Sequence, residues 1–193
     1  MTKLSQREKI LTEGLRVVHA RGYAGASVRD IVAAAGVPQG TFTNYFDSKE
    51  AFGLEILDIY SANRREMIGA TLANPALPPL QRMAAWLDAT LDCMSADGMR
   101  NGCLFGNFSA ETTDHSEAIR ERLVAIFGEL ETSVADCLQA AVAAHELPDD
   151  FACDAVAGVV VATLQGACLL AKTQRSAEPL LGFRKVLFST ILR

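Results

Sequence analysis

Apolar residues recur at helical spacing along most of this 193-residue chain. They predict a first helix over residues 5–20, ended by Gly22, with these side chains facing inward: Ile10, Leu11, Leu15, Val17 and Val18. The same periodicity predicts further helices at about 49–72, 80–96, 116–145, 151–175 and 179–192, and a helical segment after residue 103. Proline is scarce and lies between these segments. The pattern therefore predicts an all-α protein of about nine helices.

Residues 27–52 predict two short helices joined by a tight turn and leading into a third. Ser27 can cap the first helix, Gly36 permits a sharp turn, and Pro38 fits the first turn of the next helix. That second helix combines polar residues with aromatic anchors: Gln39, Thr41, Thr43 and Asn44 with Phe42, Tyr45 and Phe46. A short helix with one polar face, held against another helix, is what the major groove of DNA accepts.

The charge of the chain is unevenly distributed. The overall net charge is −5, which taken alone argues against a nucleic-acid partner. Residues 1–50, however, hold seven Lys and Arg against five Asp and Glu, whereas the remainder holds eleven against eighteen. This asymmetry fits a small basic DNA-binding head on an acidic body. Because the excess in the head is modest, we expect binding to depend on local phosphate contacts made by a dimer.

The segment around the second short helix resembles the recognition-helix signature of the TetR family of transcriptional repressors: Gly40-Thr41-Phe42-Thr43-Asn44-Tyr45-Phe46-Asp47-Ser48-Lys49-Glu50-Ala51. The resemblance extends upstream through Gly22-Tyr23 and Ser27-Val28-Arg29-Asp30-Ile31, about the first quarter of the chain. It implies a helix-turn-helix DNA-binding domain at 1–48, an effector-sensing and dimerisation domain at 49–193, and a double-stranded operator as partner.

The resemblance also implies which residues meet DNA: Ser27, Arg29, Gln39, Gly40, Thr41, Thr43, Asn44, Tyr45 and Lys49. Two of these depart from the family pattern, because Gln39 stands where Lys is common and Thr43 where Tyr is usual. Phosphate contacts position such a protein and base contacts specify sequence. The departures should therefore alter the operator or weaken phosphate binding, without abolishing the docking mode.

The last two helices are those that form a four-helix bundle between two subunits in this family. Carried over, the homodimer interface comprises Ala155, Gly158, Val159, Ala162, Gly166, Leu169, Leu181 and Val186. The small residues permit close helix approach, and the larger ones, with Val160, Leu164 and Leu187, supply an apolar seam. The alternative is that these residues only fill the core of the subunit itself.

Two short strings in the body resemble the N-ethylmaleimide-sensing subgroup of the family, the NemR-like proteins. They are Gly102-Cys103-Leu104 with Ser109-Ala110-Glu111, and the segment 171–180. In that subgroup the cysteine after the glycine senses electrophiles and oxidants, and a lysine is its partner. The resemblance implies that Cys103 is the sensor and Lys172 its partner.

The residues around Cys103 support this role independently. Cys103 follows the turn Asn101-Gly102 and begins a helical segment, where exposed N–H groups and the helix dipole favour the thiolate. Arg100 adds positive charge nearby, and contact with Lys172 would favour the thiolate further. The alternatives remain that Cys103 is inert filler and that Lys172 merely extends to solvent as its helix ends.

A second set of residues could line a ligand pocket or simply form core: Met83, Trp86, Phe105, Phe108 and Phe127. The other four cysteines, Cys93, Cys137, Cys153 and Cys168, are expected to be mostly small buried hydrophobes, and structural disulfides are not expected. Neither Cys nor His shows metal-ligand spacing, so we expect no metal and no cofactor.

The N-terminus turns polar at once, which predicts no secretory signal and a cytoplasmic location. The most apolar segment, 155–171, is just short of a membrane span, and we interpret it as a helix buried on most sides. The break at 74–79, Asn-Pro-Ala-Leu-Pro-Pro, is the best candidate for a domain-associated linker.

The main hypothesis is a homodimeric repressor on a palindromic operator, released by covalent modification of Cys103. A small apolar ligand bound in the body is the alternative trigger. An enzyme would need a base for Cys103 from His19, His115 or His145, and no nucleophile motif surrounds the cysteine, so we expect no enzyme. A dimerising scaffold would leave the recognition-helix string unexplained.

Overall fold

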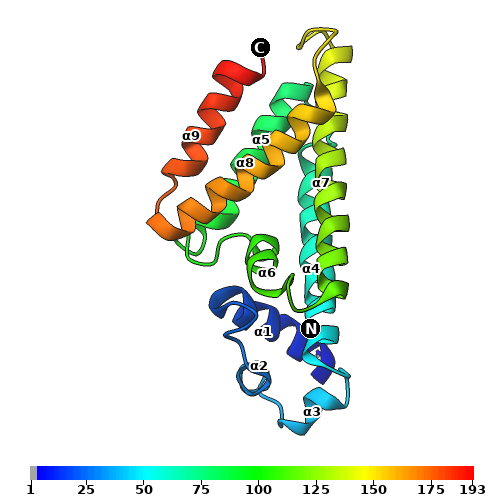
Figure 1. Ribbon diagram of the computed structural model, residues 1–193, viewed down its shortest axis with the longest axis vertical. Coiled ribbons are helices and arrows are strands. Elements are labelled where there is room, and N and C mark those ends of the chain that lie inside the picture. Colours follow the sequence, from blue (N-terminus) through cyan, green and yellow to red (C-terminus); the bar gives the residue numbers. More distant parts are fainter. Residues whose placement is uncertain (1–3) are drawn as a thin grey trace. The chain divides into compact units, whose positions relative to one another are not determined.

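The computed structural model describes residues 4–193, and in this range it holds nine α-helices, a π-helical turn and no strand. The helices are α1 (Gln6–Arg21), α2 (Val28–Ala35), α3 (Gly40–Thr43), α4 (Lys49–Ala70), α5 (Pro79–Ser95), α6 (Leu104–Thr112), α7 (Glu117–Ala143), α8 (Cys153–Gln174) and α9 (Glu178–Val186) (Figure 1). The turn Leu187–Ile191 continues α9. The all-α prediction is confirmed, and most of the predicted long helices begin and end within two residues of the observed ones. The last helix, predicted at 179–192, is α-helical only to Val186 and continues as the π-helical turn.

The chain divides into two compact units. Unit 1 combines the N-terminal residues up to Ser61 with Leu104–Leu123, and unit 2 combines Ala62–Cys103 with Val124–Arg193. Helices α4 and α7 thus contribute to both. The functional boundary expected after residue 48 concerns DNA contact and stays a prediction. The break at 74–79 connects α4 to α5 inside unit 2, and its interpretation as a domain-associated linker stays a prediction.

Local sequence defines the helix ends of the helix-turn-helix in unit 1. Ser27 accepts a hydrogen bond from the amide of Asp30, whose carboxylate accepts from the amide of Ser27, and together they form a capping box on α2. Gly36 ends α2 in the left-handed conformation, at φ 65° and ψ 36°, which a glycine adopts without strain. Ser48 Oγ accepts from the amide of Ala51, 3.0 Å away, at the start of α4.

Three phenylalanines anchor α3 in unit 1. The rings of Phe42, Phe46 and Phe52 lie with centroids 5.0–5.5 Å apart, and all three side chains are buried. Gly14 on α1 permits this packing, because a Cβ there would lie 2.5 Å from Cζ of Phe52. Edge-to-face and tilted ring pairs of this kind add to the stability gained from burial. The short helix is therefore held firmly although it has only one turn.

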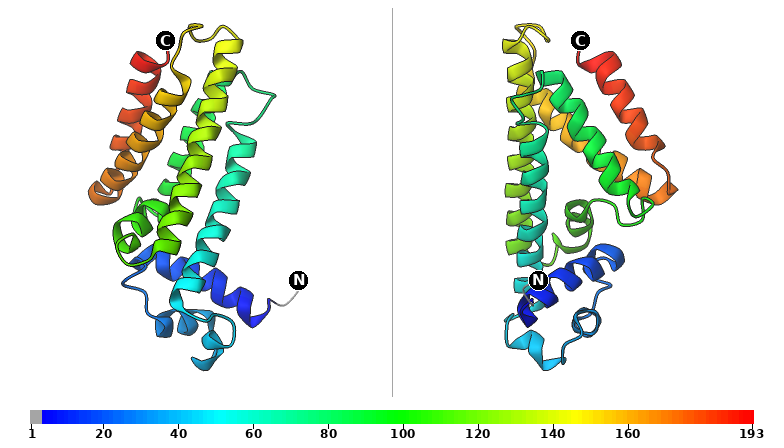
Figure 2. Two further views of the ribbon diagram at one scale, coloured as in Figure 1. Left: turned by 45° about the vertical axis from the view of Figure 1, so that its right-hand side comes forward. Right: turned by 180° about the vertical axis from the view of Figure 1, so that it is seen from behind.

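Unit 2 is a helical bundle around one hydrophobic core. Helix α9 lies beside α8 and α5 (Figures 1 and 2). The core includes Met83 and Trp86 from α5, Leu138 from α7, and Val160 and Leu164 from α8. Its buried apolar area, rather than surface charge, accounts for most of the stability of such a bundle.

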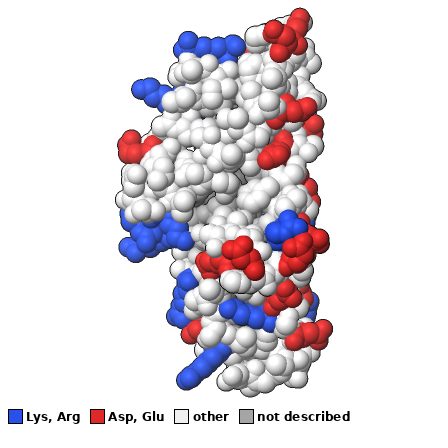
Figure 3. Space-filling view, viewed as in Figure 1, with Lys and Arg blue, Asp and Glu red and all other residues white. Residues whose placement is uncertain are grey.

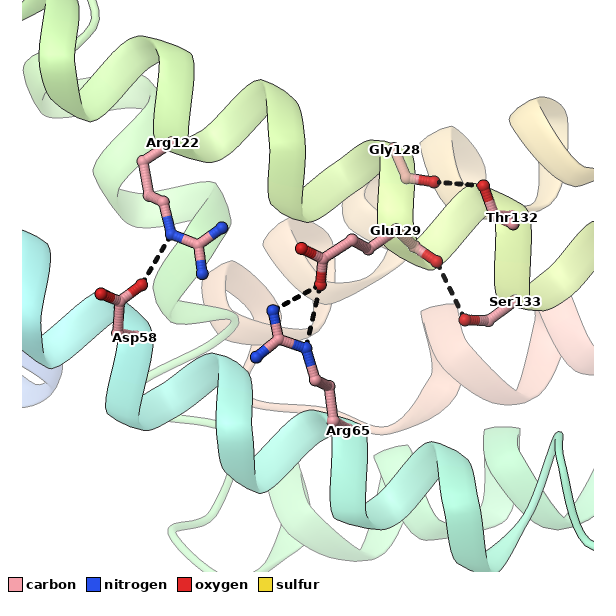
Figure 4. Close-up of polar contacts among 7 residues, drawn as sticks. All are labelled: Asp58, Arg65, Arg122, Gly128, Glu129, Thr132 and Ser133. Atoms are coloured by element: carbon pink, nitrogen blue, oxygen red, sulfur yellow. Dashed lines mark hydrogen bonds and ion pairs between the residues drawn. The ribbon is translucent and has the colours of Figure 1, made fainter.

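Ion pairs connect α4 to α7 in both units (Figure 4). In unit 1, Nε of Arg122 lies 2.6 Å from a carboxylate oxygen of Asp58. In unit 2, Arg65 donates from Nε and Nη2 to one oxygen of Glu129, at 3.0 and 2.7 Å. Pairs as exposed as these contribute at most about 1 kcal/mol each, so they orient the two helices more than they stabilise them.

Helix α8 is long and apolar enough to cross a membrane by length and composition, with a mean hydropathy of 1.8 over its most apolar window. One such helix is weak evidence, because a core helix of a soluble protein passes the same test. Only 33% of that window is buried within the chain, so the expectation of a helix buried on most sides is wrong for the isolated subunit.

Candidate DNA interface and sensor cysteine

Most residues expected to meet DNA lie on the exposed surface of the helix-turn-helix. The exposed ones are Ser27, Arg29, Gln39, Gly40, Thr43, Asn44 and Tyr45. Thr41 differs, because only 8% of its surface is accessible, and this burial counts against its expected contact with a base. The hydroxyl of Thr43 donates to the carbonyl of Gly40 at 3.0 Å, which leaves its methyl group for a partner.

Lys49 lies at the start of α4, with its side chain turned into unit 1. Its Nζ donates to the carbonyl oxygen of Tyr23 at 2.5 Å and lies 4.4 Å from the centroid of that ring. Partial burial lowers the pKa of Lys49, and the negative charge of Glu111 opposes this effect. Lys49 thus holds the turn between α1 and α2 in this structure, a role that sequence reasoning missed.

Glu111 on α6 holds the same turn. Its carboxylate accepts a hydrogen bond from the amide of Ala24 at 2.7 Å. Gly22 has φ +81°, and a Cβ there would lie 2.5 Å from Oε1 of Glu111, so the carboxylate occupies the space that only a glycine leaves. Beside it, the rings of Phe108 and Tyr23 lie 4.9 Å apart. Glu111 belongs to a string that the resemblance singled out, but nothing local could have shown its contact with a turn 87 residues away.

Cys103 lies directly before α6, at the end of a hydrogen-bonded loop in unit 2. Oxygens of Asp97 accept hydrogen bonds from the amides of Arg100 and Asn101, at 2.9 and 3.2 Å. Nη1 of Arg175 donates to the carbonyls of Met99 and Arg100, at 3.2 and 2.9 Å. Cys103 is half-buried and not in a disulfide, so part of the residue is exposed.

The structure brings Lys172 to this loop, as the sequence-based hypothesis requires. Gly102 has φ +71°, and a Cβ at this position would lie 3.0 Å from Cδ of Lys172 and 3.5 Å from its Cβ. The aliphatic part of Lys172 therefore packs directly over Gly102, the neighbour of Cys103. Whether its ammonium acts on the thiol is a prediction that this packing leaves open.

The other cysteines differ in burial. Cys137 and Cys168 are buried, and burial raises the pKa of Cys137 to about 11 and that of Cys168 to about 12. Cys153 is half-buried and Cys93 is exposed. The expectation that these cysteines are small buried hydrophobes is confirmed for Cys137 and Cys168 and is wrong for Cys93, whereas the half-buried Cys153 packs against the core. No His, Cys, Asp and Glu cluster of metal-binding type occurs among residues 4–193.

The five residues considered for a ligand pocket divide between the two units. Met83 and Trp86 are buried in the core of unit 2, and Phe127 packs against that core. Phe105 and Phe108 are buried in unit 1. An open groove of about 520 Å³ in unit 2 is lined by other residues: Gln139, Val142, Asp149, Phe151, Ala152, Cys153, Asp154 and Ala155.

The residues expected at a dimer interface form an exposed apolar surface on α8 and α9. Among the large ones, Val159 is 55% exposed, Leu169 63%, Leu181 42% and Val186 52%. Ala155, Ala162 and Gly166 are exposed as well, and Gly158 is half-buried. Val160, Leu164 and Leu187, expected in the same seam, face the core instead. Figure 3 shows that the surface over α8 carries almost no Lys, Arg, Asp or Glu.

Both halves of the chain match known regulators. Residues 10–56 match the family described as bacterial regulatory proteins, tetR family, and residues 79–187 match the Tetracyclin repressor-like C-terminal domain. The chain is 35% identical over 192 residues to the HTH-type transcriptional repressor DhaR of Mycobacterium sp. (strain GP1), covering 100% of this chain and 95% of DhaR. It is 32% identical over 122 residues to the HTH-type transcriptional repressor NemR of Escherichia coli (strain K12), covering 63% of this chain and 61% of NemR.

Solved structures agree with these matches. A regulatory protein TetR from Rhodobacter sphaeroides superposes with a TM-score of 0.89 at 28% identity, covering 93% of this chain and 95% of its own. The reduced form of E. coli NemR superposes with a TM-score of 0.83 at 31% identity, covering 92% of each chain. The helix-turn-helix and the helical body therefore have one explanation: the chain belongs to the TetR family of bacterial transcriptional repressors.

Proposed function

We propose that this repressor binds a palindromic operator as a cytoplasmic homodimer and is released when an electrophile or oxidant modifies Cys103. The main support for this proposal is the position of Cys103. The half-buried Cys103 lies directly before α6, and Glu111 on α6 holds the α1–α2 turn of the DNA-binding head. Chemistry at the thiol thus acts on the residue that directly precedes a helix on which the head depends.

The exposed face of the helix-turn-helix supports operator binding. Gln39 and Asn44 are exposed and can each pair with an adenine edge through two hydrogen bonds. Arg29 is exposed on α2, where it can contact phosphate. In a symmetric dimer, one α3 from each subunit would enter successive major grooves, which requires a palindromic site.

The apolar surface on α8 and α9 supports dimerisation. A contiguous apolar surface of this kind is unusual on a monomer and is typical of a protein interface. The small residues of α8, such as Ala162 and Gly166, let a second helix approach closely. The segment 155–171 contains no charged residue, so burying it against a second copy leaves no charge unpaired.

Modification of Cys103 would release DNA by favouring a non-binding arrangement of the heads. The loop before α6 is closely packed, with Lys172 over Gly102, and an adduct on the half-buried thiol needs room there. A preference of about 1–3 kcal/mol for the non-binding state lowers operator affinity several-fold to roughly a hundredfold. A solved relative described as the reduced form of NemR fits a redox-dependent state in that protein, and we extend the idea to this chain.

The test is operator binding by the purified protein before and after stoichiometric N-ethylmaleimide. We expect the wild type to bind the DNA upstream of its own gene and to release it after alkylation, whereas Cys103→Ser binds and stays bound. Cys93→Ser is the matched control, because Cys93 is an exposed cysteine on α5, and it should respond like the wild type. If Cys103→Ser still releases DNA, the covalent trigger at Cys103 is wrong.

A non-covalent apolar ligand is the alternative trigger. It would apply if wild type and Cys103→Ser both bind the operator and neither responds to thiol reagents. Its binding would then be sought by thermal shift with apolar compounds, because a ligand that prefers the folded protein raises the melting temperature.

A further inference from the structure

Cys168 occupies the same face of α8 as Lys172. The two residues are four positions apart in one helix, so their side chains lie one above the other on the helix surface. Lys172 packs over Gly102: a Cβ added at Gly102 would lie 3.5 Å from the Cβ of Lys172. The loop that carries Cys103 therefore crosses α8 about one turn from Cys168.

The two thiols also share one environment. Cys168 is a member of the hydrophobic core of unit 2, and Cys103 packs against that core from its edge. Burial raises the pKa of Cys168 to about 12, and the charge of a Cys103 thiolate contributes to the same shift. Such an electrostatic effect acts only between groups that are near each other. The packing of Lys172 over Gly102, the four-residue spacing of Cys168 and Lys172, and the effect of Cys103 on the pKa of Cys168 all indicate that the two thiols are neighbours.

We propose that Cys103 and Cys168 form a disulfide when the protein meets a two-electron oxidant such as hydrogen peroxide. In the first step the Cys103 sulfur attacks the peroxide, the O–O bond breaks, and a sulfenic acid and one water form. In the second step the Cys168 sulfur attacks the Cys103 sulfur, the S–O bond breaks, and the hydroxyl leaves as water with the thiol proton. Two thiols are oxidised by one peroxide, which is reduced to two waters.

The different burial of the two cysteines sets the order of these steps. Cys103 is half-buried and meets the oxidant first. Cys168 is only 3% exposed and remains a protonated thiol, so it resists direct attack from solvent. A resolving partner also prevents further, irreversible oxidation of the sensor.

This inference deepens the proposed function: it rests on Cys103 as the modified thiol and adds a separate product for oxidants. An electrophile such as N-ethylmaleimide leaves a bulky adduct on Cys103, whereas peroxide leaves a link between the loop before α6 and α8. The two classes of effector would therefore displace DNA through different covalent states of one site.

The test is peptide mapping of the full-length protein after treatment with a small excess of hydrogen peroxide and alkylation of the remaining thiols under denaturing conditions. We expect a cross-linked peptide pair that contains Cys103 and Cys168, and its disappearance on reduction. In Cys168→Ala, Cys103 should instead accumulate as sulfenic acid that dimedone traps. Cys137→Ala is the matched control, because Cys137 is a buried core thiol whose Sγ contacts the carbonyl of Pro79, and it should keep the disulfide.

Recovery of Cys168 fully alkylated in oxidised wild type would overturn the proposal, as would a Cys103 disulfide to another cysteine or to a second copy. The mapping of wild type does not depend on any variant, so a destabilised Cys168→Ala cannot obscure the result. N-ethylmaleimide release of DNA is measured in parallel. Release without a Cys103–Cys168 disulfide contradicts only this inference, whereas failure of release contradicts the proposed function.

Discussion

The carboxylate of Glu111 connects α6 to the turn between α1 and α2 in unit 1. Glu111 accepts from the amide of Ala24 and fills the space over Gly22, and its charge lies near Lys49. Sequence patterns could mark Gly22 as a helix end and Glu111 as part of a string, but not their contact. Side-chain pairing between distant segments depends on the fold, because helical periodicity reports only which face of each helix is apolar.

Replacing Glu111 should lower the stability of the DNA-binding head. Glu111→Ala removes a hydrogen bond between a charged acceptor and a backbone amide, which costs about 1–3 kcal/mol, and we expect weaker operator binding with it. Chemical denaturation and DNA titration measure the two effects. Glu117→Ala is the control, since Glu117 pairs with Arg120 on the surface of α7; an equal loss in both variants would argue against a special role for Glu111.

Gly102 is a second position where one residue type is required. Gly102→Ala places an L-residue at φ +71° and a methyl group 3.0 Å from Cδ of Lys172. The left-handed conformation costs about 1–2 kcal/mol, and displacement of Lys172 should change the alkylation rate of Cys103. Gly98→Ala is the control, because Gly98 has φ +66° but open space around it. It should lose similar stability in urea yet leave the alkylation rate unchanged.

Helices were the most predictable elements of this protein. The starts of α2 and α4 follow from Ser27 and Ser48, and the end of α2 follows from Gly36, because capping and left-handed conformations depend on local chemistry. The grouping of α6 with the N-terminal helices was not predictable, since it depends on contacts such as that between Phe108 and Tyr23. No feature of the chain between Cys103 and Leu104 marks the point where one unit ends.

Because of the cap of α2, the stability of the folded protein should depend on pH. The side-chain and backbone hydrogen bonds from Ser27, helped by Arg21, hold the pKa of Asp30 below its usual value. A lowered pKa stabilises the fold above the pKa of the unfolded chain, and this contribution disappears as the pH falls through the folded value. Ser27→Ala should cost about 1 kcal/mol near neutral pH and less in acid. Thermal melts across an acid series check this.

Ser133→Ala is the control for that series, because the Ser133 hydroxyl donates to the carbonyl of Glu129 and involves no titrating partner. Its effect on the melting temperature should not change with pH. A Ser27→Ala difference that stays constant into acid would show that the Asp30 cap contributes nothing.

The exposed apolar surface of α8 and α9 affects how the whole molecule associates with a second copy. A single subunit leaves Leu169 63% exposed on a helix that has no charge between Asp154 and Lys172. Such a surface is stable in water when a second copy covers it. The low net charge of the head then matters less, because a dimer doubles the number of phosphate contacts.

Placing a charge on this surface should separate the subunits. Leu169→Asp would bury an unpaired carboxylate in the interface, and we expect a monomer by light scattering and operator affinity reduced at least tenfold. Val124→Asp is the control, because Val124 is equally exposed, at 60%, but lies on α7. It should remain dimeric and bind DNA normally. A dimeric Leu169→Asp would place the interface elsewhere.

The sequence by itself determined the helical class, the helix ends and the recognition segment, because periodicity, caps and glycine conformations are local properties. It also identified Cys103 as a thiol at the start of a helix. Only the tertiary structure decided that Thr41 and Lys49 turn into unit 1, that Glu111 holds the α1–α2 turn, and that Lys172 lies over Gly102. These facts depend on which distant surfaces pack together, and packing is a property of the folded chain as a whole.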